Sequence, residues 1–426
     1  MCYDSYVIVE EKMNTNRYPR DLSGKFCQSK QIEWPNGAKI AVQFVLNYEE
    51  GGENCLLHGD AQSEGFLSEI INAVPWPNQR HWNMESIYEY GARAGFWRIY
   101  NLFTHHSIPI TVYGIATALA RSPEQVHAMK LADWEIASHG LKWIEHKDLS
   151  QHEEEELIKK AIELHRSVTG EPPKGWYTGR ASMNSVELVC KQDKVDYISD
   201  SYADDLPYWH IYRNKPHLII PYTLDANDMR FANTQGFNSG DQFFTYLKDS
   251  FDCLYREGEN GSPKMLSIGL HCRIIGRPGR IESLNKFLLY IQSFKDVWCP
   301  RRIDISDYWH LNYPFDIETW QSRVTVLSKS DFITKFSNVF ENGSWIAQEA
   351  FNLELGPSHN TAIGLHNALC RAFRSASLEK RKSLLEAQNG FFDNPSLFEK
   401  CLAKNKQDLA KKLALKYAKK FGFEYT

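Results

Sequence analysis

The chain has 426 residues, of which 42% are hydrophobic and 24% are charged, the balance of an ordinary soluble globular protein. The formal net charge of −4 at pH 7 gives no indication of nucleic acid or an anionic membrane as a partner. No segment approaches the roughly 18 apolar residues of a membrane span, and the first residues lack the apolar core of a signal peptide, so we expect neither feature.

The cysteines indicate a reducing compartment. All nine occur singly, with no Cys-x-x-Cys pair, and their number is odd. This distribution argues against a disulfide framework or a zinc ribbon. We therefore expect a cytoplasmic protein.

In chain order, residues 1–37 are rich in Pro, Gly, Asn and charge and predict an irregular N-terminal arm. Strand patterns then alternate with helical ones. A Ser-x-x-Glu capping box opens one of the helices and Gly170 is its expected stop. The alternation predicts βα units and a parallel sheet or barrel. Strands are expected over 38–46, 108–116, 195–199, 218–222 and 264–271, and helices over 86–104, 150–168, 241–257 and 279–294.

The pattern changes near residue 316. Beyond Glu318 helical patterns dominate, and glycine and proline become sparse. We predict an α/β domain over 38–316 followed by a smaller all-α domain over 317–426. The lysine-rich helix near the C-terminus, with Leu409, Leu413 and Tyr417 on one face, is interpreted as a solvated face.

Three strand ends carry side chains suited to catalysis. Glu49 and Glu50 follow a buried run and precede two glycines, while His139 and His271 each end a short apolar run. Catalytic groups of parallel barrels come from the carboxyl ends of several strands. The segments therefore predict an active site that is either hydrolytic or metal-binding.

A zinc site lacks an evident second histidine. Lys142 and Trp143 stand at the positions three and four residues after His139, and neither is a ligand, whereas His146 would need a particular loop. His271 could act as a general acid, a hydrogen-bond donor or a ligand, or be a satisfied core histidine.

Two further segments are candidates for substrate binding. Trp176, Tyr177 and Arg180 could form a flat slot with a charged clamp, or be ordinary loop packing. Asn227 and Asp228 belong to a polar cluster suited to a small, amide-rich substrate, or to an Asx turn.

These segments fall in the order of the polysaccharide deacetylase (NodB-homology) family, which the chain resembles over about residues 16–314. Glu49-Glu50 stands at the family's Asp-Asp pair, His139 at the first metal histidine, and His271 at the late histidine. Trp143 replaces the second metal histidine. The loop before Arg180 lacks the family's arginine and paired prolines.

With these departures the chain closely resembles the cofactor-independent, PuuE-type allantoinases. Long shared segments carry the likeness, including 44–53, 85–91, 204–209 and 264–278. The resemblance implies a distorted (β/α) barrel of NodB type, a homotetramer, no required metal, and hydrolysis of allantoin to allantoate in purine catabolism. An incomplete Asp-His-His set agrees with the expected absence of zinc.

The resemblance also implies roles. Glu49 would be the base, Glu50 and His139 would orient water or substrate, and His271 would donate a proton. Substrate-binding residues are expected to be Trp143, Trp176, Tyr177, Arg180, Asn227, Asp228 and Arg273.

The C-terminal 110 residues or so resemble the all-helical OHCU decarboxylase family. Matching segments are 332–340, 344–348, 365–369 and 415–423. No histidine stands near Ala387–Gly390, where that family's catalytic His-Pro-Asp-Leu stretch should fall, so an inactive, truncated remnant is expected.

Two alternatives remain open at this point. One is a metal-dependent N-deacetylase of carbohydrates, with zinc held by Glu50, His139 and His146. The other is a non-catalytic scaffold. The lost histidine and the Glu-Glu pair argue against the deacetylase, and the intact barrel motifs argue against the scaffold. Whether Glu49, His139 and His271 converge in a pocket is the observation that discriminates between these hypotheses.

Overall fold

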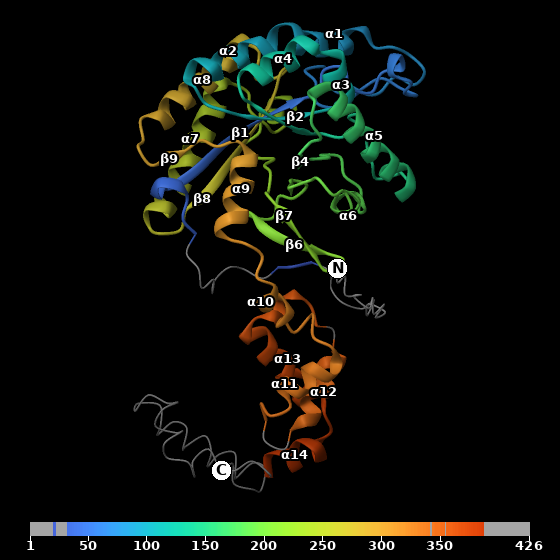
Figure 1. Cartoon of the computed structure of the whole chain (residues 1–426), viewed down its shortest axis with the longest axis vertical. Helices are drawn as coiled ribbons and strands as arrows, with labels where there is room; N and C mark the ends of the chain where they lie inside the picture. Colours follow the sequence, from blue (N-terminus) through green and yellow to red (C-terminus); the bar gives the residue numbers. More distant parts are fainter. Residues whose placement is uncertain (1–19, 23–31, 341–342, 354, 387–426) are drawn as a thin grey trace, which may run out of the picture. The chain divides into compact units, whose positions relative to one another are not determined.

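The computed structural model describes residues 20–22, 32–340, 343–353 and 355–386 (Figure 1). The chain divides into two compact units, one spanning Ser29–Phe315 and the other containing the residues from Asp316 onward. The predicted boundaries at 37/38 and 316/317 stay predictions, and most of the expected N-terminal arm lies outside the described residues. Among the helices that are described, none is long and apolar enough to cross a membrane.

The first unit is built on a curled, half-barrel sheet in the strand order β6-β7-β5-β4-β3-β2-β1-β8, with β9 paired to the start of β1. Every strand pair is parallel except the β6–β7 hairpin. The predicted α/β barrel class is therefore confirmed. The strands are β1 (Ile40–Tyr48), β2 (Thr111–Gly114), β3 (Glu135–Ser138), β4 (Gly175–Trp176), β5 (Tyr197–Ile198), β6 (Tyr208–Tyr212), β7 (Lys215–Ile219), β8 (Lys264–His271) and β9 (Val297–Trp298).

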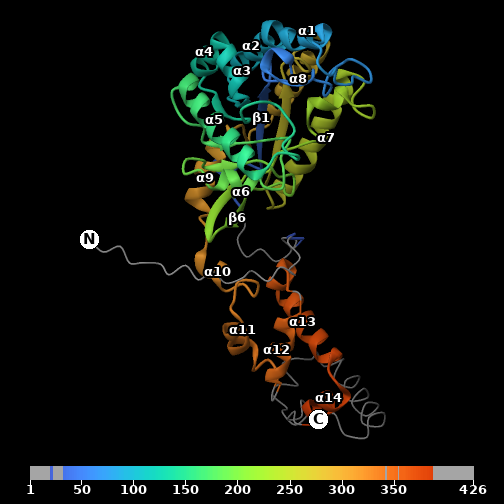
Figure 2. The same ribbon diagram turned by 90° about the vertical axis from the view of Figure 1, so that its right-hand side faces the viewer.

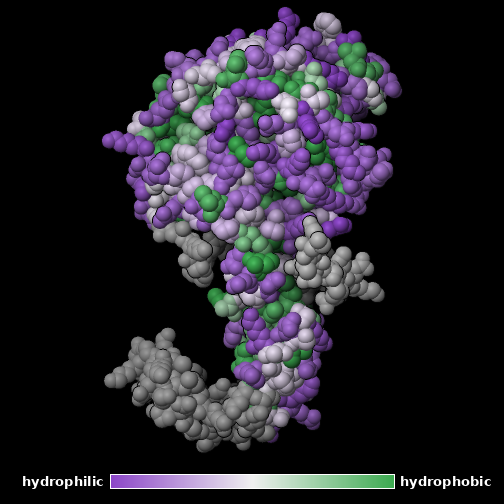
Figure 3. Space-filling model, in the orientation of Figure 1, coloured by the Kyte–Doolittle hydropathy of each residue, from purple (hydrophilic) through white to green (hydrophobic). Residues whose placement is uncertain are grey.

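Helices cover the outer face of this sheet, and β1 runs between α5 and α7 in the view of Figure 2. The surface visible in Figure 3 is mainly hydrophilic over this unit, with apolar residues in small separate groups. The α-helices are α1 (Trp82–Tyr90), α2 (Phe96–His106), α3 (Ala116–Arg121), α4 (Pro123–Leu131), α5 (Gln151–Thr169), α6 (Ser185–Cys190), α7 (Gly240–Glu259), α8 (Pro278–Gln292) and α9 (Arg302–Asn312).

Strand β1 is buried on both faces, and its side chains alternate between two environments. Phe44 and Leu46 point outward into the main core with α2 and α8. Val45 points inward, where it packs with aromatic residues of neighbouring strands. This alternation continues past the strand end and places Asn47 and Glu49 on the inner face.

Several elements differ from those predicted from the sequence. The predicted helix over 86–104 is two α-helices joined by a π-helical turn, Gly91–Gly95. Gly95, at the end of this turn, lies against the backbone of Cys272, where a Cβ would clash. The β6–β7 hairpin was not predicted. Strand β2 is shorter than expected because Ala116 already begins α3.

A buried arginine on the inner side of the half-barrel connects several of its strands. Arg302 of α9 is fully buried and donates hydrogen bonds to the Gln43 side chain (2.6 Å), to Ser267 and Ser199, and to the Pro221 carbonyl. These partners belong to β1, β8 and the segments after β5 and β7. The guanidinium therefore links strands that the open sheet does not connect by backbone hydrogen bonds.

The described part of the second unit is helical and has its own apolar core around Phe332, Ile346 and Leu369. It contains no strand within the described residues. Residues 387–426, with the Ala387–Gly390 stretch and the lysine-rich helix, lie outside them. The helices are α10 (Ile317–Gln321), α11 (Lys329–Phe336), α12 (Ser344–Asn352), α13 (Ala362–Ser375) and α14 (Leu378–Glu386).

Candidate active site

A pocket of about 390 Å³ opens at the carboxyl ends of the central strands. Strand register explains its position, since Asn47 is aligned with His271, Tyr48 with Gly114, and Gly114 with Ser138. The residues after these strand ends therefore meet at one edge of the sheet. Its lining is Asn47, Glu49, Phe66, Leu67, His139, Trp143, Glu145, Lys147, Tyr177, Gly179, Arg180, Ala181, Tyr202, Tyr222, Leu224, Asn227, Met229 and His271.

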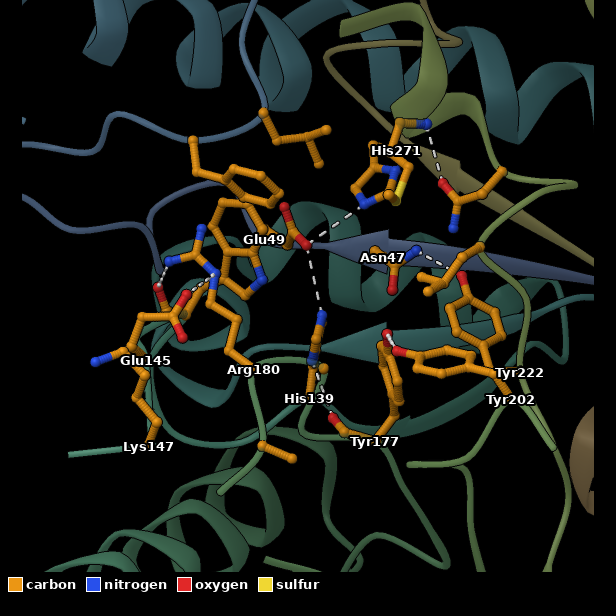
Figure 4. Close-up of a pocket in the computed structure, with 18 residues that line it drawn as sticks. Asn47, Glu49, His139, Glu145, Lys147, Tyr177, Arg180, Tyr202, Tyr222 and His271 are labelled. Carbon is orange, nitrogen blue, oxygen red and sulfur yellow. Dashed lines mark hydrogen bonds and ion pairs between the residues drawn. The ribbon is translucent and has the colours of Figure 1, made fainter. Parts of the chain in front are cut away.

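Glu49 lies at the floor of the pocket between two imidazoles (Figure 4). Its Oε1 is 3.4 Å from Nε2 of His139 and 3.5 Å from Nε2 of His271. Its Oε2 forms an ion pair with Arg273 at 2.7 Å. Burial raises the pKa of Glu49, but Arg273 and His271 outweigh burial and hold that pKa well below its usual range. The carboxylate is therefore ionised at neutral pH.

His271 is fixed by a buried carboxylate. Its Nδ1 donates to Oδ1 of Asp228 at 2.6 Å, so Nε2 is the nitrogen that faces Glu49. Burial lowers the pKa of His271, but the charges of Asp228 and Glu49 outweigh burial and raise it to about 9. The ring is consequently an imidazolium at neutral pH and can donate a proton from Nε2.

His139 is oriented differently. Its Nδ1 donates to the Tyr177 carbonyl at 2.9 Å, and a carbonyl can only accept. Nε2 is therefore the nitrogen that faces Glu49. Gly179 permits this approach, because its φ is +75° and a Cβ there would lie 2.9 Å from the imidazole.

Glu50 and Arg273 lie behind the pocket rather than in its lining. Glu50 points to the opposite side of the chain from Glu49, packs against Gly91, and is 3.6 Å from Arg273. Burial raises the pKa of Glu50. Arg273 is also stacked on Tyr88, 4.3 Å from the ring centre. Arg273 thus contacts the Glu49 carboxylate from behind, and Glu50 supports that guanidinium.

One wall carries a second guanidinium. Arg180 lies 3.7 Å from the ring centre of Trp143 and 5.0 Å from that of Phe66, and its head is 3.5 Å from Glu64. Cation–π contact and the carboxylate hold it at the pocket. A loop anchor supports this wall, since His146 donates its backbone N–H to the Arg180 carbonyl and its ring bonds Glu154.

The predicted residues divide into three groups. Glu49, His139, His271, Trp143, Tyr177, Arg180 and Asn227 line the pocket. Glu50, Asp228 and Arg273 lie directly behind it. Trp176 is not brought to the pocket: strand alternation turns it into a separate core, where its indole N–H donates to Thr178. The substrate contact predicted for Trp176 is therefore wrong for this arrangement.

Sequence reasoning missed several lining residues, notably Asn47, Tyr202 and Tyr222. The alternation of β1 could have indicated Asn47, which stands two residues before Glu49 on the same face. Nothing comparable marks Tyr202 and Tyr222. They reach the pocket from the segments after β5 and β7, whose positions depend on the whole sheet.

The residues present fit a divalent metal poorly. A cation bound to Glu49 would lie beside the buried guanidinium of Arg273, and like charges at that distance repel strongly. The alternative set of Glu50, His139 and His146 is not assembled, since Glu50 faces Arg273 and His146 bonds Glu154. Within the described ranges, no group of three His, Cys, Asp or Glu residues has a metal-binding arrangement.

Comparison with known proteins finds relatives described as polysaccharide deacetylases. The polysaccharide deacetylase family model matches residues 84–194. A putative polysaccharide deacetylase of Schizosaccharomyces pombe is 44% identical over 317 residues, covering 70% of this chain and 98% of the relative.

Two solved structures are similar in sequence and fold. A probable polysaccharide deacetylase from Pseudomonas aeruginosa PAO1 is 52% identical, with a TM-score of 0.69 over 70% of this chain and 100% of that one. The crystal structure of a PuuE allantoinase is 51% identical, also with a TM-score of 0.69, over 70% of this chain and 99% of that one. The half-barrel is thus of the NodB type.

Proposed function

The chain belongs to the polysaccharide deacetylase family, and we propose that it opens the hydantoin ring of allantoin by hydrolysis, giving allantoate, without a metal ion. The observation that carries the proposal is the environment of Glu49. A guanidinium and two imidazoles surround this carboxylate, and Arg273 supplies a fixed positive charge beside it. The similarity to a PuuE allantoinase supports the choice of substrate.

The first step is attack of water on the ring carbonyl. Glu49 takes one proton from the water, and the oxygen of that water bonds to the carbonyl carbon at the same time. Because the pKa of Glu49 is low, the driving force for this transfer is small. Glu49 contributes to catalysis because it is always ionised and because it is held rigidly in place. Arg180 and His271 are the positively charged groups that can stabilise the developing oxyanion.

The second step breaks the ring C–N bond. The imidazolium of His271 gives its Nε2 proton to the departing nitrogen, and the carbonyl reforms as a carboxylic acid, which then ionises. The proton held by Glu49 passes to Nε2 of His271, 3.5 Å away, and restores the starting state. The ring of His139, whose Nε2 lies 3.4 Å from Oε1 of Glu49, orients the attacking water.

A second candidate is the metal-dependent deacetylation of an N-acetylated sugar. The names of two relatives favour it, as both are polysaccharide deacetylases by name. The repulsion between a metal ion and Arg273 argues against it. A non-catalytic scaffold is a weaker candidate, since it gives no reason for an ionised carboxylate between two imidazoles.

The test is to incubate the purified full-length chain with racemic allantoin, with and without a strong chelator, and to measure allantoate. Chelator-resistant hydrolysis is expected. Loss of activity with the chelator and recovery with zinc would favour the metal-dependent reaction. A parallel assay with N-acetylglucosamine oligomers reports deacetylation.

We propose that the helical second unit is an inactive OHCU decarboxylase-like domain. We also propose that the protein is a homotetramer and acts in purine catabolism. Support for the domain comes from the sequence segments that fall on α11, α12 and α13. Addition of the decarboxylase substrate should give no product, and light scattering would measure the mass of the assembly.

A further inference from the structure

We propose that Asn47 is a specificity-determining residue that accepts a hydrogen bond from an N–H of the substrate, and so selects cyclic amides with a free ring N–H. This inference rests on the proposed ring-opening function and names the group that recognises the substrate. It assigns a role to a pocket residue that the catalytic steps do not use.

The orientation of the Asn47 amide follows from its partners. Its Nδ2 donates to the Leu270 carbonyl at 3.2 Å and to the hydroxyl of Tyr222 at 2.9 Å. A backbone carbonyl can only accept, so the nitrogen must lie on that side. The amide oxygen, Oδ1, is therefore fixed on the other side, since a flipped side chain would place that oxygen against the Leu270 carbonyl.

The amide oxygen of Asn47 has no hydrogen-bond partner in the part of the chain that the structure describes. Asn47 is 1% exposed and lines the pocket. A buried acceptor without a partner is costly, and a ligand N–H entering the pocket would remove that cost. A carbonyl or an N-methyl group at the same place would leave the acceptor unsatisfied.

Asn47 is held rigidly beside the reacting centre. It lies in β1, aligned with His271 of β8, and shares the inner face with Glu49 two residues later. Tyr222, which fixes the amide, is itself packed against Tyr177 with ring centres 4.7 Å apart. In Figure 4 the bond from Asn47 to Tyr222 lies on the side of the pocket away from Arg180.

This arrangement defines the ligand class. Asn47 offers an acceptor on one side of Glu49, and the Arg180 guanidinium offers donors on the other. A hydantoin ring, which carries N–H groups next to its carbonyls, can use both at once. An analogue methylated on the ring nitrogen that meets Asn47 loses one bond and adds bulk in a buried position.

The experiment measures binding, so it does not depend on turnover. Hydantoin, 1-methylhydantoin and 3-methylhydantoin are titrated calorimetrically into the wild-type chain and into Asn47→Leu. The wild type should bind one N-methyl analogue at least about tenfold more weakly than hydantoin, because a site built for an N–H rejects an analogue that lacks it. In Asn47→Leu this ratio should fall below about threefold.

The wild type alone can overturn the inference, even if Asn47→Leu does not fold. Equal binding of all three compounds by the wild type, or no binding of any, would overturn it. An unchanged ratio of affinities for hydantoin and its N-methyl analogue in a folded Asn47→Leu would overturn it as well. Tyr222→Phe, which keeps the acceptor, should retain the preference for the free N–H. Failure of the proposed function is a separate result: it would appear as no allantoate from allantoin while hydantoin still binds selectively.

Discussion

Asp228 supports His271 through both of its carboxylate oxygens. Oδ1 accepts from the imidazole Nδ1 at 2.6 Å, while Oδ2 accepts the backbone N–H groups of His271 (2.7 Å) and Ile275 (3.0 Å). One side chain therefore fixes the tautomer and charge of the ring and also the turn after β8. It does so from the first residue of the short helix η4, Asp228–Ala232.

Asp228→Asn should lower the pKa of His271 from about 9, because the nearest negative charge is lost. The imidazolium is the proposed proton donor, so activity falls as pH rises through its pKa. The alkaline limb of the pH–rate profile for allantoin hydrolysis should move to lower pH, and kcat at neutral pH should fall by up to about 100-fold, the lower end of what a positioned proton donor contributes. Asp241→Asn, at an exposed position, is the control and should leave the profile unchanged.

The same pair gives a pH dependence of stability. The folded pKa of His271, about 9, is above its unfolded value of about 6.5. Protonation therefore favours the fold. The stabilisation is complete below pH 6.5 or so and is lost as pH rises through about 9. Urea unfolding at several pH values should show this loss in the wild type and less of it in His271→Gln. If the free energy of unfolding changed equally with pH in both proteins between pH 6.5 or so and about 9, the pH dependence could not be assigned to His271.

Glu49→Gln should strongly reduce turnover while keeping the shape of the side chain. Removal of the proton acceptor is expected to lower kcat by about 10²–10⁴-fold. Glu156→Gln, on the exposed face of α5, is the matched control. If Glu49→Gln hydrolysed allantoin at the wild-type rate, the carboxylate could not be the base.

Arg302→Met should destabilise the first unit. The variant leaves the side chains of Gln43, Ser199 and Ser267 and the Pro221 carbonyl buried without their donor. We expect a loss of about 3 kcal/mol or more in the free energy of unfolding, measured by urea denaturation. A loss below about 0.5 kcal/mol would show that this network contributes little.

Gly95→Ala should disturb the active site from outside. A Cβ there would lie 2.0 Å from the backbone oxygen of Cys272, the residue after His271. Overpacking of this kind costs about 1–3 kcal/mol and should reduce activity by moving the end of β8. Gly279→Ala is the control, because a Cβ at Gly279 meets nothing within 4 Å. Thermal unfolding and kcat would be compared in the two variants.

Much of the fold could be predicted from the sequence because strand and helix patterns are local. The Ser150 capping box and the left-handed Gly170 bound α5 as expected, and β1 and β8 lie within the predicted ranges or close to them. The β6–β7 hairpin escaped prediction. Its strands are only partly buried and include Pro216, so they lack a clear apolar pattern.

The sequence by itself determined which chemical groups stand at the strand ends: Glu49, His139 and His271 were identified from their places after apolar runs. Only the tertiary structure decided which of them meet and in which state. The ionisation of Glu49 and the charge of His271 depend on Arg273 and Asp228, whose side chains reach them only in the folded sheet. Hydrogen bonds and charges act over a few ångströms in space, whatever the separation along the chain.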